Sequence, residues 1–328
     1  MIRKDEKIVV NFVMSNDVYS GIFDALVGFY KKYLPEDINL YITKYPIARA
    51  DVYHYHRPNL ESNLKENSVV TVHHDLDDTD PWFDSSMFID RYHEANKILC
   101  LNSKQVAYLK INENFNNTVL IPHGVNPEIF NYRPKVFNES RKFRIGVVSK
   151  RYARRVKGEA YLHEIYKRLD PNIIEFIFVG EGRSIDKLYS ESLGFSSTAY
   201  ESLPYEMFDE LYKEMDVLLV PSLFEGGPAN IPEAIYCGVP ILGRNIAMIK
   251  DYLENGKNGY FLTGDFDVDS SLISDLACDN NGVFTSVIEN IKNSERPCFT
   301  WEKVVNKHAE VYRDVVAFRA KDQKMYEL

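Results

Sequence analysis

The sequence predicts two α/β domains in tandem, each built around a doubly wound parallel sheet. Short apolar runs alternate with longer amphipathic stretches along the chain, which is typical of repeated strand–helix–strand units. A polar stretch with two prolines, residues 126–142, interrupts this alternation near the middle and predicts a linker. The length of 328 residues is also long for one ordinary domain and suits two.

The first half supplies the elements of one sheet. The apolar run at residues 7–14 predicts a buried strand, and residues 19–34 carry apolar side chains at helical spacing, including Ile22, Leu26 and Tyr33. Further strands are predicted at residues 38–42, 50–55, 69–73, 97–101 and 118–122. Further helices are predicted at residues 84–96 and 103–111. Because parallel strands need crossover connections, this order favours a parallel sheet.

The second half repeats the same rhythm. Its predicted strands are residues 143–149, 173–180, 216–221, 239–242 and 259–262. Its predicted helices are residues 158–169, 184–193, 204–213, 231–237 and 246–253. A last helix at residues 301–318 is expected to pack back on the first domain. We therefore expect an N-terminal domain at 1–135, a C-terminal domain at 136–300 and the returning segment at 301–328, with a ligand-binding cleft between the carboxyl ends of the two sheets.

The composition excludes several classes of protein. A net charge of −9 disfavours a general nucleic-acid binder or a binder of anionic membranes. The first residues run into too short an apolar stretch for a signal peptide, and no apolar window reaches about 18 residues, the length of a membrane span. The four cysteines are far apart and form no C-x-x-C pair. We expect a cytoplasmic protein and leave a peripheral membrane association open.

The most informative stretch is residues 216–243, DVLLVPSLFEGGPANIPEAIYCGVPILG. A strand ends there, and a loop with Glu225, Gly226 and Gly227 leads into a helix that contains Glu233. Glycines let a ligand approach the backbone, and the start of a helix favours a phosphate. Carboxylates are good acceptors from sugar hydroxyls. A phosphate site flanked by two carboxylates predicts a nucleoside-diphosphate sugar as the ligand.

This stretch resembles the donor site of glycosyltransferase family 4, the retaining enzymes of GT-B fold, with their Glu-x7-Glu signature. The resemblance implies that Glu225 contacts the transferred sugar and Glu233 the ribose. The family also has an arginine and a lysine after the first strand of this domain, and Arg151 and Lys157 in RYARRVKG resemble that pair. By the resemblance, these two cations face the diphosphate and stabilise charge on the leaving group.

The remaining site residues come from the same resemblance. His73, at the end of VVTVH, is expected to face the transferred sugar and to join Glu225, Arg151 and Lys157 as the catalytic set. The other expected donor-binding residues are Gly21, Gly180, Gly226, Gly227, Pro228, Ala229, Asn230 and Glu233.

The resemblance implies a hexosyltransferase that moves a sugar from a nucleoside-diphosphate sugar to a hydroxyl acceptor with retention. It implies two Rossmann-like domains, no obligate protein nucleophile, no metal and no cofactor beyond the donor substrate. The acceptor stays open among a saccharide, a lipid-linked glycan, a metabolite and other hydroxyl compounds. The nucleotide base, the sugar and the oligomeric state also stay open.

Other functions remain as alternatives. The same fold also serves acceptor-independent nucleotide-sugar epimerases and hydrolases, and a non-catalytic sugar-nucleotide-binding protein is a further alternative. His54 and His56 on one strand, with His73, His74 and Asp75, are a possible ligand set for a metal-dependent hydrolase. Residues 75–80 contain an Asp-x-Asp triplet, which we expect to be an exposed acidic loop.

Overall fold

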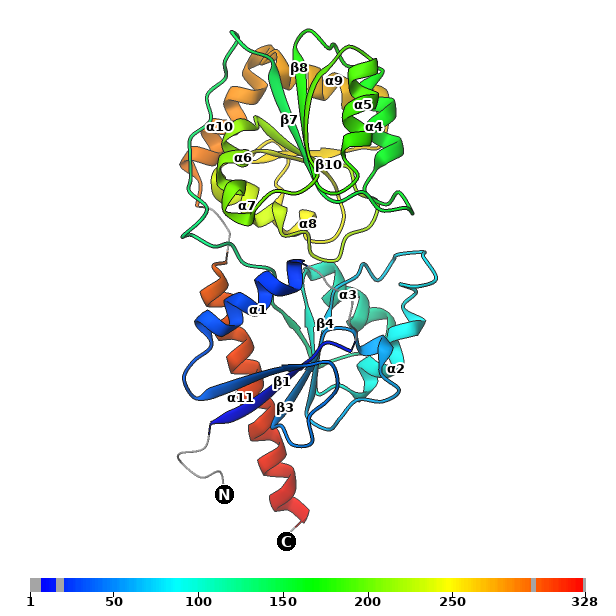
Figure 1. The fold of residues 1–328 in the computed structure, drawn as a ribbon, viewed down its shortest axis with the longest axis vertical. Coiled ribbons are helices and arrows are strands. Elements are labelled where there is room, and N and C mark those ends of the chain that lie inside the picture. Colours follow the sequence, from blue (N-terminus) through cyan, green and yellow to red (C-terminus); the bar gives the residue numbers. More distant parts are fainter. Residues whose placement is uncertain (1–6, 16–20, 296–298, 327–328) are drawn as a thin grey trace. The chain divides into compact units, whose positions relative to one another are not determined.

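The computed structural model describes residues 7–15, 21–295 and 299–326 (Figure 1). The chain divides into two compact units. One unit consists of the chain up to Gly124 together with the segment from Phe299 onward, and the other is Val125–Cys298. Both units are α/β with a parallel sheet, as predicted, and each sheet has six strands.

The first unit has the strand order β2-β1-β3-β4-β5-β6. Its strands are β1 (Ile8–Val13), β2 (Ile38–Thr43), β3 (Val52–Tyr55), β4 (Ser68–Val72), β5 (Lys97–Cys100) and β6 (Thr118–Leu120). Its helices are α1 (Gly21–Tyr33), η1 (Pro58–Leu60), α2 (Ser86–Glu94), α3 (Ser103–Asn112) and α11 (Trp301–Tyr326). Every residue of β3 and β4 is buried, which is expected for parallel strands that are covered on both faces.

Helix α11 packs on the first unit although it lies at the far end of the sequence (Figure 1). Trp301 stacks on Phe29 of α1 with ring centroids 4.7 Å apart. Further along, the hydroxyl of Tyr312 lies 2.8 Å from Nδ1 of His54 on β3, and Arg313 forms a two-bond ion pair with Asp37. Apolar and polar contacts together therefore attach α11 to β3 and to the region of α1.

The second unit has the strand order β12-β11-β10-β7-β8-β9. Its strands are β7 (Phe143–Val148), β8 (Ile174–Val179), β9 (Ser196–Tyr200), β10 (Val217–Val220), β11 (Ile241–Arg244) and β12 (Gly259–Leu262). Its helices are α4 (Glu159–Tyr166), α5 (Ser184–Ser192), η2 (Tyr205–Met207), α6 (Phe208–Glu214), α7 (Asn230–Cys237), α8 (Ile249–Tyr252), α9 (Phe266–Ala277), η3 (Asn280–Gly282) and α10 (Val283–Asn293). The winding reverses between β7 and β10, which are neighbours in the sheet. Loops diverge at such a switch point and leave room for a ligand.

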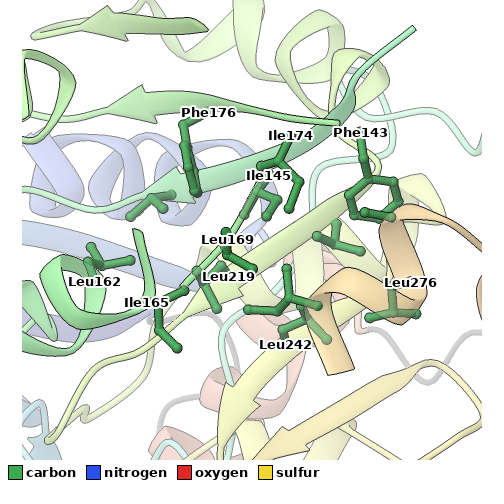
Figure 2. Close-up of a cluster of buried hydrophobic side chains, with 14 of the residues drawn as sticks. Phe143, Ile145, Leu162, Ile165, Leu169, Ile174, Phe176, Leu219, Leu242 and Leu276 are labelled. Atoms are coloured by element: carbon green, nitrogen blue, oxygen red, sulfur yellow. The ribbon is translucent and has the colours of Figure 1, made fainter. Parts of the chain in front are cut away.

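The core of the second unit joins its strands to the surrounding helices. Figure 2 shows Ile145 of β7 and Leu219 of β10 among side chains contributed by other strands and by α4 and α9. Leu162 and Ile165 of α4 are both fully buried in this cluster. The position of α4 is therefore set by the core beneath it, and the loop that precedes α4 is held over the end of β7.

Three features differ from the sequence predictions. The contacts place the boundary between the units after Gly124, before the predicted linker, because residues such as Phe130 pack on Tyr205 and Tyr212 of the second unit. Strand β9 was not predicted, since it is an edge strand of serine, threonine and alanine with alternating exposure and not an apolar run. Helices α9 and α10 were not predicted either.

Among the described helices, none combines the length and the apolar composition that a membrane span requires.

Replacing Trp301 by alanine is expected to destabilise the first unit. The indole is 5% exposed and fills space between α11 and α1, so its removal leaves a cavity. We expect the free energy of unfolding to fall by about 3–5 kcal/mol, as for other buried aromatic truncations. Urea unfolding followed by circular dichroism measures this loss. Glu302→Ala, at the exposed neighbouring position, is the control, and an equal effect of both changes would contradict the packing role.

Candidate functional site

The candidate site lies at the carboxyl end of the second unit's sheet, where the loops after β7 and β10 meet. The backbone N–H of Leu223 donates to the carbonyl of Val156 at 2.8 Å, and the side-chain amide of Asn230 donates to the carbonyl of Val148 at 2.7 Å. Gly158 lies so close to Pro221 that a Cβ at this position would come within 2.4 Å of the proline carbonyl oxygen. The loop after β7 and the loop after β10, which are distant in sequence, are thus in direct contact at the carboxyl edge of the sheet.

Lys157 and Glu225 form an ion pair across these two loops. The lysine Nζ lies 2.5 Å from Oε1 of Glu225, and the two side chains are 15% and 9% exposed. Both groups are shielded from bulk water, so their mutual attraction is stronger than that of an exposed pair. The structure therefore brings together a cation and a carboxylate that the sequence analysis assigned to different parts of a ligand.

Glu233 lies in the first turn of α7 and is 4% exposed. Its Oε1 accepts a hydrogen bond from the hydroxyl of Tyr205 at 2.8 Å, and its Oε2 accepts one from Tyr212 at 2.9 Å. Burial raises the pKa of Glu233 from its usual 4.5 to about 7, while the two tyrosine hydrogen bonds act in the opposite direction. The sequence analysis missed both tyrosines. Their signal was their spacing of seven residues, which places two side chains on one face of a helix.

Arg151 leaves the end of β7 beside the loop that follows β8. Its backbone N–H donates to the carbonyl of Glu181 at 2.9 Å, and its Nη1 donates to Oδ1 of Asp186 at 2.6 Å. Gly180 permits this approach, because its φ is +130° and a Cβ there would lie 2.6 Å from the carbonyl oxygen of Ser149. A non-glycine residue at this position would separate the two loops.

The other basic residues of this loop differ from Arg151 and Lys157. Arg154 and Arg155 are exposed, whereas Arg151 and Lys157 are half-buried. Arg151 pairs with Asp186, and Lys157 pairs with Glu225. The two residues that the sequence analysis selected are thus the more buried ones.

The loop before α7 contains the other expected donor-binding residues. Gly226 is buried, and Gly227, Pro228 and Ala229 are half-buried along the path from Glu225 to Asn230. Ala229 is the N-cap of α7 and offers no side-chain acceptor to the first-turn N–H groups. A helix start of this kind suits an anion.

Two expected residues belong to the first unit and not to this edge. His73 follows β4, and its Nε2 lies 3.0 Å from Nδ1 of His56. Gly21 is the first residue of α1. The catalytic role expected of His73 and the donor-binding role expected of Gly21 remain predictions.

Four histidines of the first unit form a neutral cluster around a small cavity. His56, His73, His123 and His308 line a small cavity of about 10 Å³. Burial lowers the pKa of His56 to about 3 and the pKa values of His123 and His308 to about 4. These imidazoles are therefore uncharged near neutral pH, and they pack as polar members of a core.

The ligand set proposed for a metal is engaged in other contacts. His54 uses Nδ1 toward Tyr312 and Nε2 toward the hydroxyl of Thr71, at 2.8 and 2.7 Å. His74 stacks on Phe88 with ring centroids 3.9 Å apart. Within the described ranges, no three histidine, cysteine, aspartate or glutamate side chains are arranged to share a metal ion. The geometry gives the metal-hydrolase alternative no support.

The expectation of an exposed acidic loop at residues 75–80 is wrong for two of its members. Asp75 and Asp78 are buried. Asp75 forms an ion pair with Lys104 at 3.0 Å and accepts the backbone N–H of Asp77 at 3.1 Å. A carboxylate with these partners tolerates burial that an unpaired one does not.

Comparison with known proteins connects this edge to a family. Residues 131–272 match the family model described as "Glycosyl transferases group 1". This segment contains Arg151, Lys157, Glu225 and Glu233. Residues 131–272 are therefore similar to a glycosyl transferases group 1 domain.

One curated relative covers more of the chain. It is the "UDP-Gal:alpha-D-GlcNAc-diphosphoundecaprenol alpha-1,3-galactosyltransferase" of Escherichia coli, which is 24% identical over 238 residues. The alignment covers 68% of this chain and 59% of the relative, so the match spans about three fifths of that protein's length.

Solved structures resemble the whole described fold. Sucrose-phosphate synthase from Thermosynechococcus elongatus aligns with a TM-score of 0.71 at 14% identity, over 95% of this chain and 100% of that chain. Anabaena HepE in complex with UDP-glucose has a TM-score of 0.69 at 16% identity, over 94% and 100% of the two chains. WaaG, described as a glycosyltransferase involved in lipopolysaccharide biosynthesis, has a TM-score of 0.64 at 14% identity, over 93% and 99%. These similarities confirm the predicted fold class, two Rossmann-like α/β domains of GT-B type.

Replacing Glu233 by glutamine is expected to change how stability depends on pH. The folded pKa of Glu233, about 7, lies above its usual 4.5, so the folded chain holds this proton more tightly than the unfolded chain. The contribution of the group to stability is therefore complete below pH 4.5, and it falls as the pH rises to 7, by on the order of 3 kcal/mol. Urea unfolding at pH 5 and pH 8 should show the variant gaining on the wild type at the higher pH.

The control is Glu206→Gln, which removes an exposed carboxylate next to Tyr205 in the sequence. If both variants respond to pH in the same way, the buried environment of Glu233 is not the cause.

Proposed function

We propose that the chain is a retaining glycosyltransferase that moves a hexosyl group from a UDP-sugar to a hydroxyl acceptor without a metal ion. The observation that carries this proposal is the 2.5 Å pairing of Lys157 with Glu225 at the β7–β10 switch point. A cation suited to phosphate and a carboxylate suited to sugar hydroxyls thus lie side by side at the end of the sheet where open α/β folds bind ligands.

The neighbouring groups fit the other parts of a nucleotide sugar. Arg151 adds a second cation, and the start of α7 adds N–H groups that favour an anion. Glu233, in the first turn of α7, is the acceptor proposed for the ribose hydroxyls. The order of charges along this edge corresponds to a diphosphate with a sugar on each side.

The chemistry requires stabilisation of the leaving group. As the bond from the anomeric carbon to the diphosphate oxygen breaks, positive charge develops on the sugar and negative charge on the diphosphate. In this proposal, Arg151, Lys157 and the start of α7 stabilise the diphosphate. The acceptor oxygen bonds to the same face of the anomeric carbon, and its proton passes to an oxygen of the departing diphosphate. No protein nucleophile is needed, and Glu225 orients the sugar through its hydroxyls.

The relatives support UDP as the nucleotide. The Escherichia coli relative is named for UDP-Gal, and Anabaena HepE was solved with UDP and with UDP-glucose. The acceptor of that relative makes a saccharide on a lipid diphosphate the first acceptor to test. We assign acceptor binding to the first unit, with His73 facing the transferred sugar. A cytoplasmic location belongs to the same proposal, since Cys100, Cys237 and Cys278 are free thiols.

Ligand binding and product analysis test the proposal together. UDP and UDP-galactose at 100 times their Kd should stabilise the chain by about 2.7 kcal/mol, which a thermal-shift panel with the GDP, ADP and dTDP analogues detects. Incubation of UDP-galactose with a saccharide acceptor should give a glycoside of α configuration. Release of free sugar or an epimer from the donor alone would favour the hydrolase or epimerase alternative. Binding without any product would favour a non-catalytic protein.

Replacing Glu225 by glutamine should separate binding from transfer. UDP lacks the transferred sugar, so it makes no contact that the loss of the Glu225 carboxylate could weaken. In the variant, the charge of Lys157 is no longer neutralised by a carboxylate and is available to the diphosphate. We expect UDP to bind several-fold more tightly, up to about tenfold, because a partly buried charge pair contributes on the order of 1 kcal/mol. Transfer should fall by about 100-fold or more, because the charged acceptor for the sugar hydroxyls is lost.

Isothermal titration with UDP and a transfer assay measure the two effects of Glu225→Gln. The control is Glu164→Gln on α4, which removes the carboxylate that pairs with Lys167 and Arg168 and should leave both quantities unchanged. Weaker UDP binding in Glu225→Gln would show that the Lys157–Glu225 pair does not compete with the diphosphate.

A further inference from the structure

Asp186 of α5 is a buried carboxylate for which the sequence analysis had no role. It is fully buried, and each of its two oxygens accepts from a different arginine. Oδ1 accepts from Nη1 of Arg151 at 2.6 Å, and Oδ2 accepts from Nη1 of Arg183 at 2.8 Å. One carboxylate therefore joins two guanidinium groups from different loops.

Arg183 anchors this carboxylate to the end of β7. The arginine is itself fully buried, and its Nε donates to the carbonyl of Ser149 at 2.7 Å. Its Nη2 donates to the hydroxyl of the same serine, also at 2.7 Å. Ser149 in turn is bonded through its N–H to the carbonyl of Val179 at the end of β8. Asp186 is thus fixed to the sheet and not to a mobile surface.

Of the three charged side chains in this cluster, only Arg151 is accessible to solvent. Asp186 and Arg183 are fully buried, whereas the side chain of Arg151 is 14% exposed. Two guanidinium groups share one carboxylate, and of these three side chains only Arg151 is partly exposed. An anion can therefore approach the cluster beside Arg151.

His163 is the other group near Asp186 that could take the place of Arg151. Its Nε2 lies 3.6 Å from Oδ1 of Asp186. Burial lowers the pKa of His163, so the imidazole is neutral near neutral pH and does not compete as a cation. Arg151 therefore keeps its hold on Asp186 under ordinary conditions.

We propose that Asp186 is a positioning residue that fixes the guanidinium of Arg151 for the diphosphate of the donor. This inference rests on the proposed function. Asp186 does not touch the ligand, and it acts through Arg151, while Arg183 ties it to the end of β7. A guanidinium held in place before the ligand arrives loses less rotamer entropy on binding than a free one.

A double-mutant cycle on UDP affinity tests this role. We expect Asp186→Asn to weaken UDP binding about tenfold, since it removes a charge-assisted hydrogen bond that orients Arg151. In the Arg151→Ala background the same change should alter the Kd less than twofold, because nothing is left to position. Asp186→Glu should recover part of the affinity. The control is Glu191→Gln, which breaks an exposed pair with Lys187 on the same helix and should have no effect.

Uridine separates positioning from a structural effect. It carries the same base and ribose but no diphosphate, so its affinity, measured by ligand-observed NMR, should be equal in wild type and Asp186→Asn. A parallel loss for uridine and UDP would overturn the inference. An unchanged UDP affinity in Asp186→Asn would overturn it as well, and so would a loss of equal size in the Arg151→Ala background.

A second variant serves as a control for misfolding. Asp186→Asn leaves two buried arginines with one neutral partner, which is costly. Arg183→Gln/Asp186→Asn removes one buried charge of each sign, and it should keep the wild-type circular dichroism spectrum and show the same tenfold loss of UDP affinity. A wild-type affinity in this folded variant would overturn the inference.

Failure of the proposed function has a different signature. If the wild-type chain binds neither UDP nor UDP-galactose, the proposed function fails and this inference fails with it. If Arg151→Ala weakens UDP binding while the Asp186 variants do not, the proposed function stands and the positioning role alone is overturned.

Discussion

The pairing of β7 with β10 is the constraint on which the candidate site depends. These strands are far apart in the chain and adjacent in the sheet, and the winding reverses between them. Their carboxyl ends must therefore open into loops that run in different directions. Lys157 comes from one loop and Glu225 from the other, so a 2.5 Å contact between them exists only because the sheet is ordered in this way. The core beneath α4 keeps this arrangement in place.

Each charge expected to meet the ligand already has a partner within the second unit. Lys157 faces Glu225, Arg151 faces Asp186, and Glu233 accepts from two tyrosines. The physical reason is the cost of burying an unpaired charge, which exceeds the cost of forming a pair. A ligand that enters this edge competes with the Lys157–Glu225 pair and must offer both groups equivalent interactions. A diphosphate flanked by hydroxyls has the complementary chemistry, and this complementarity is a stronger argument than the presence of any one residue.

In the first unit, two sequence patterns have a structural explanation other than the one they suggested. Histidines that cluster on neighbouring strands are typical of metal centres, but here His54 contacts Tyr312 of the distant α11 and the neighbouring Thr71. The buried imidazoles are held neutral by the low polarity around them. The acidic run at residues 75–80 is similar, since Lys104 of α3 accounts for the burial of Asp75. In both cases the partner is remote in sequence, and local pattern carries no trace of it.

The sequence by itself determined the fold class, most of the elements and the positions of the Glu225–Glu233 spacing, because apolar periodicity and glycine-rich loops are local properties. It did not reveal β9, whose polar residues form an edge strand only when β8 lies beside them. It selected Arg151 and Lys157 only by resemblance and did not reveal their partners. The tertiary structure alone decided that Arg151 pairs with Asp186 and Lys157 with Glu225, that Tyr205 and Tyr212 hold Glu233, and that Asp186 joins Arg151 to Arg183. These facts depend on contacts between segments far apart in the chain, and such contacts are set by the order of strands in the sheet and not by any local pattern.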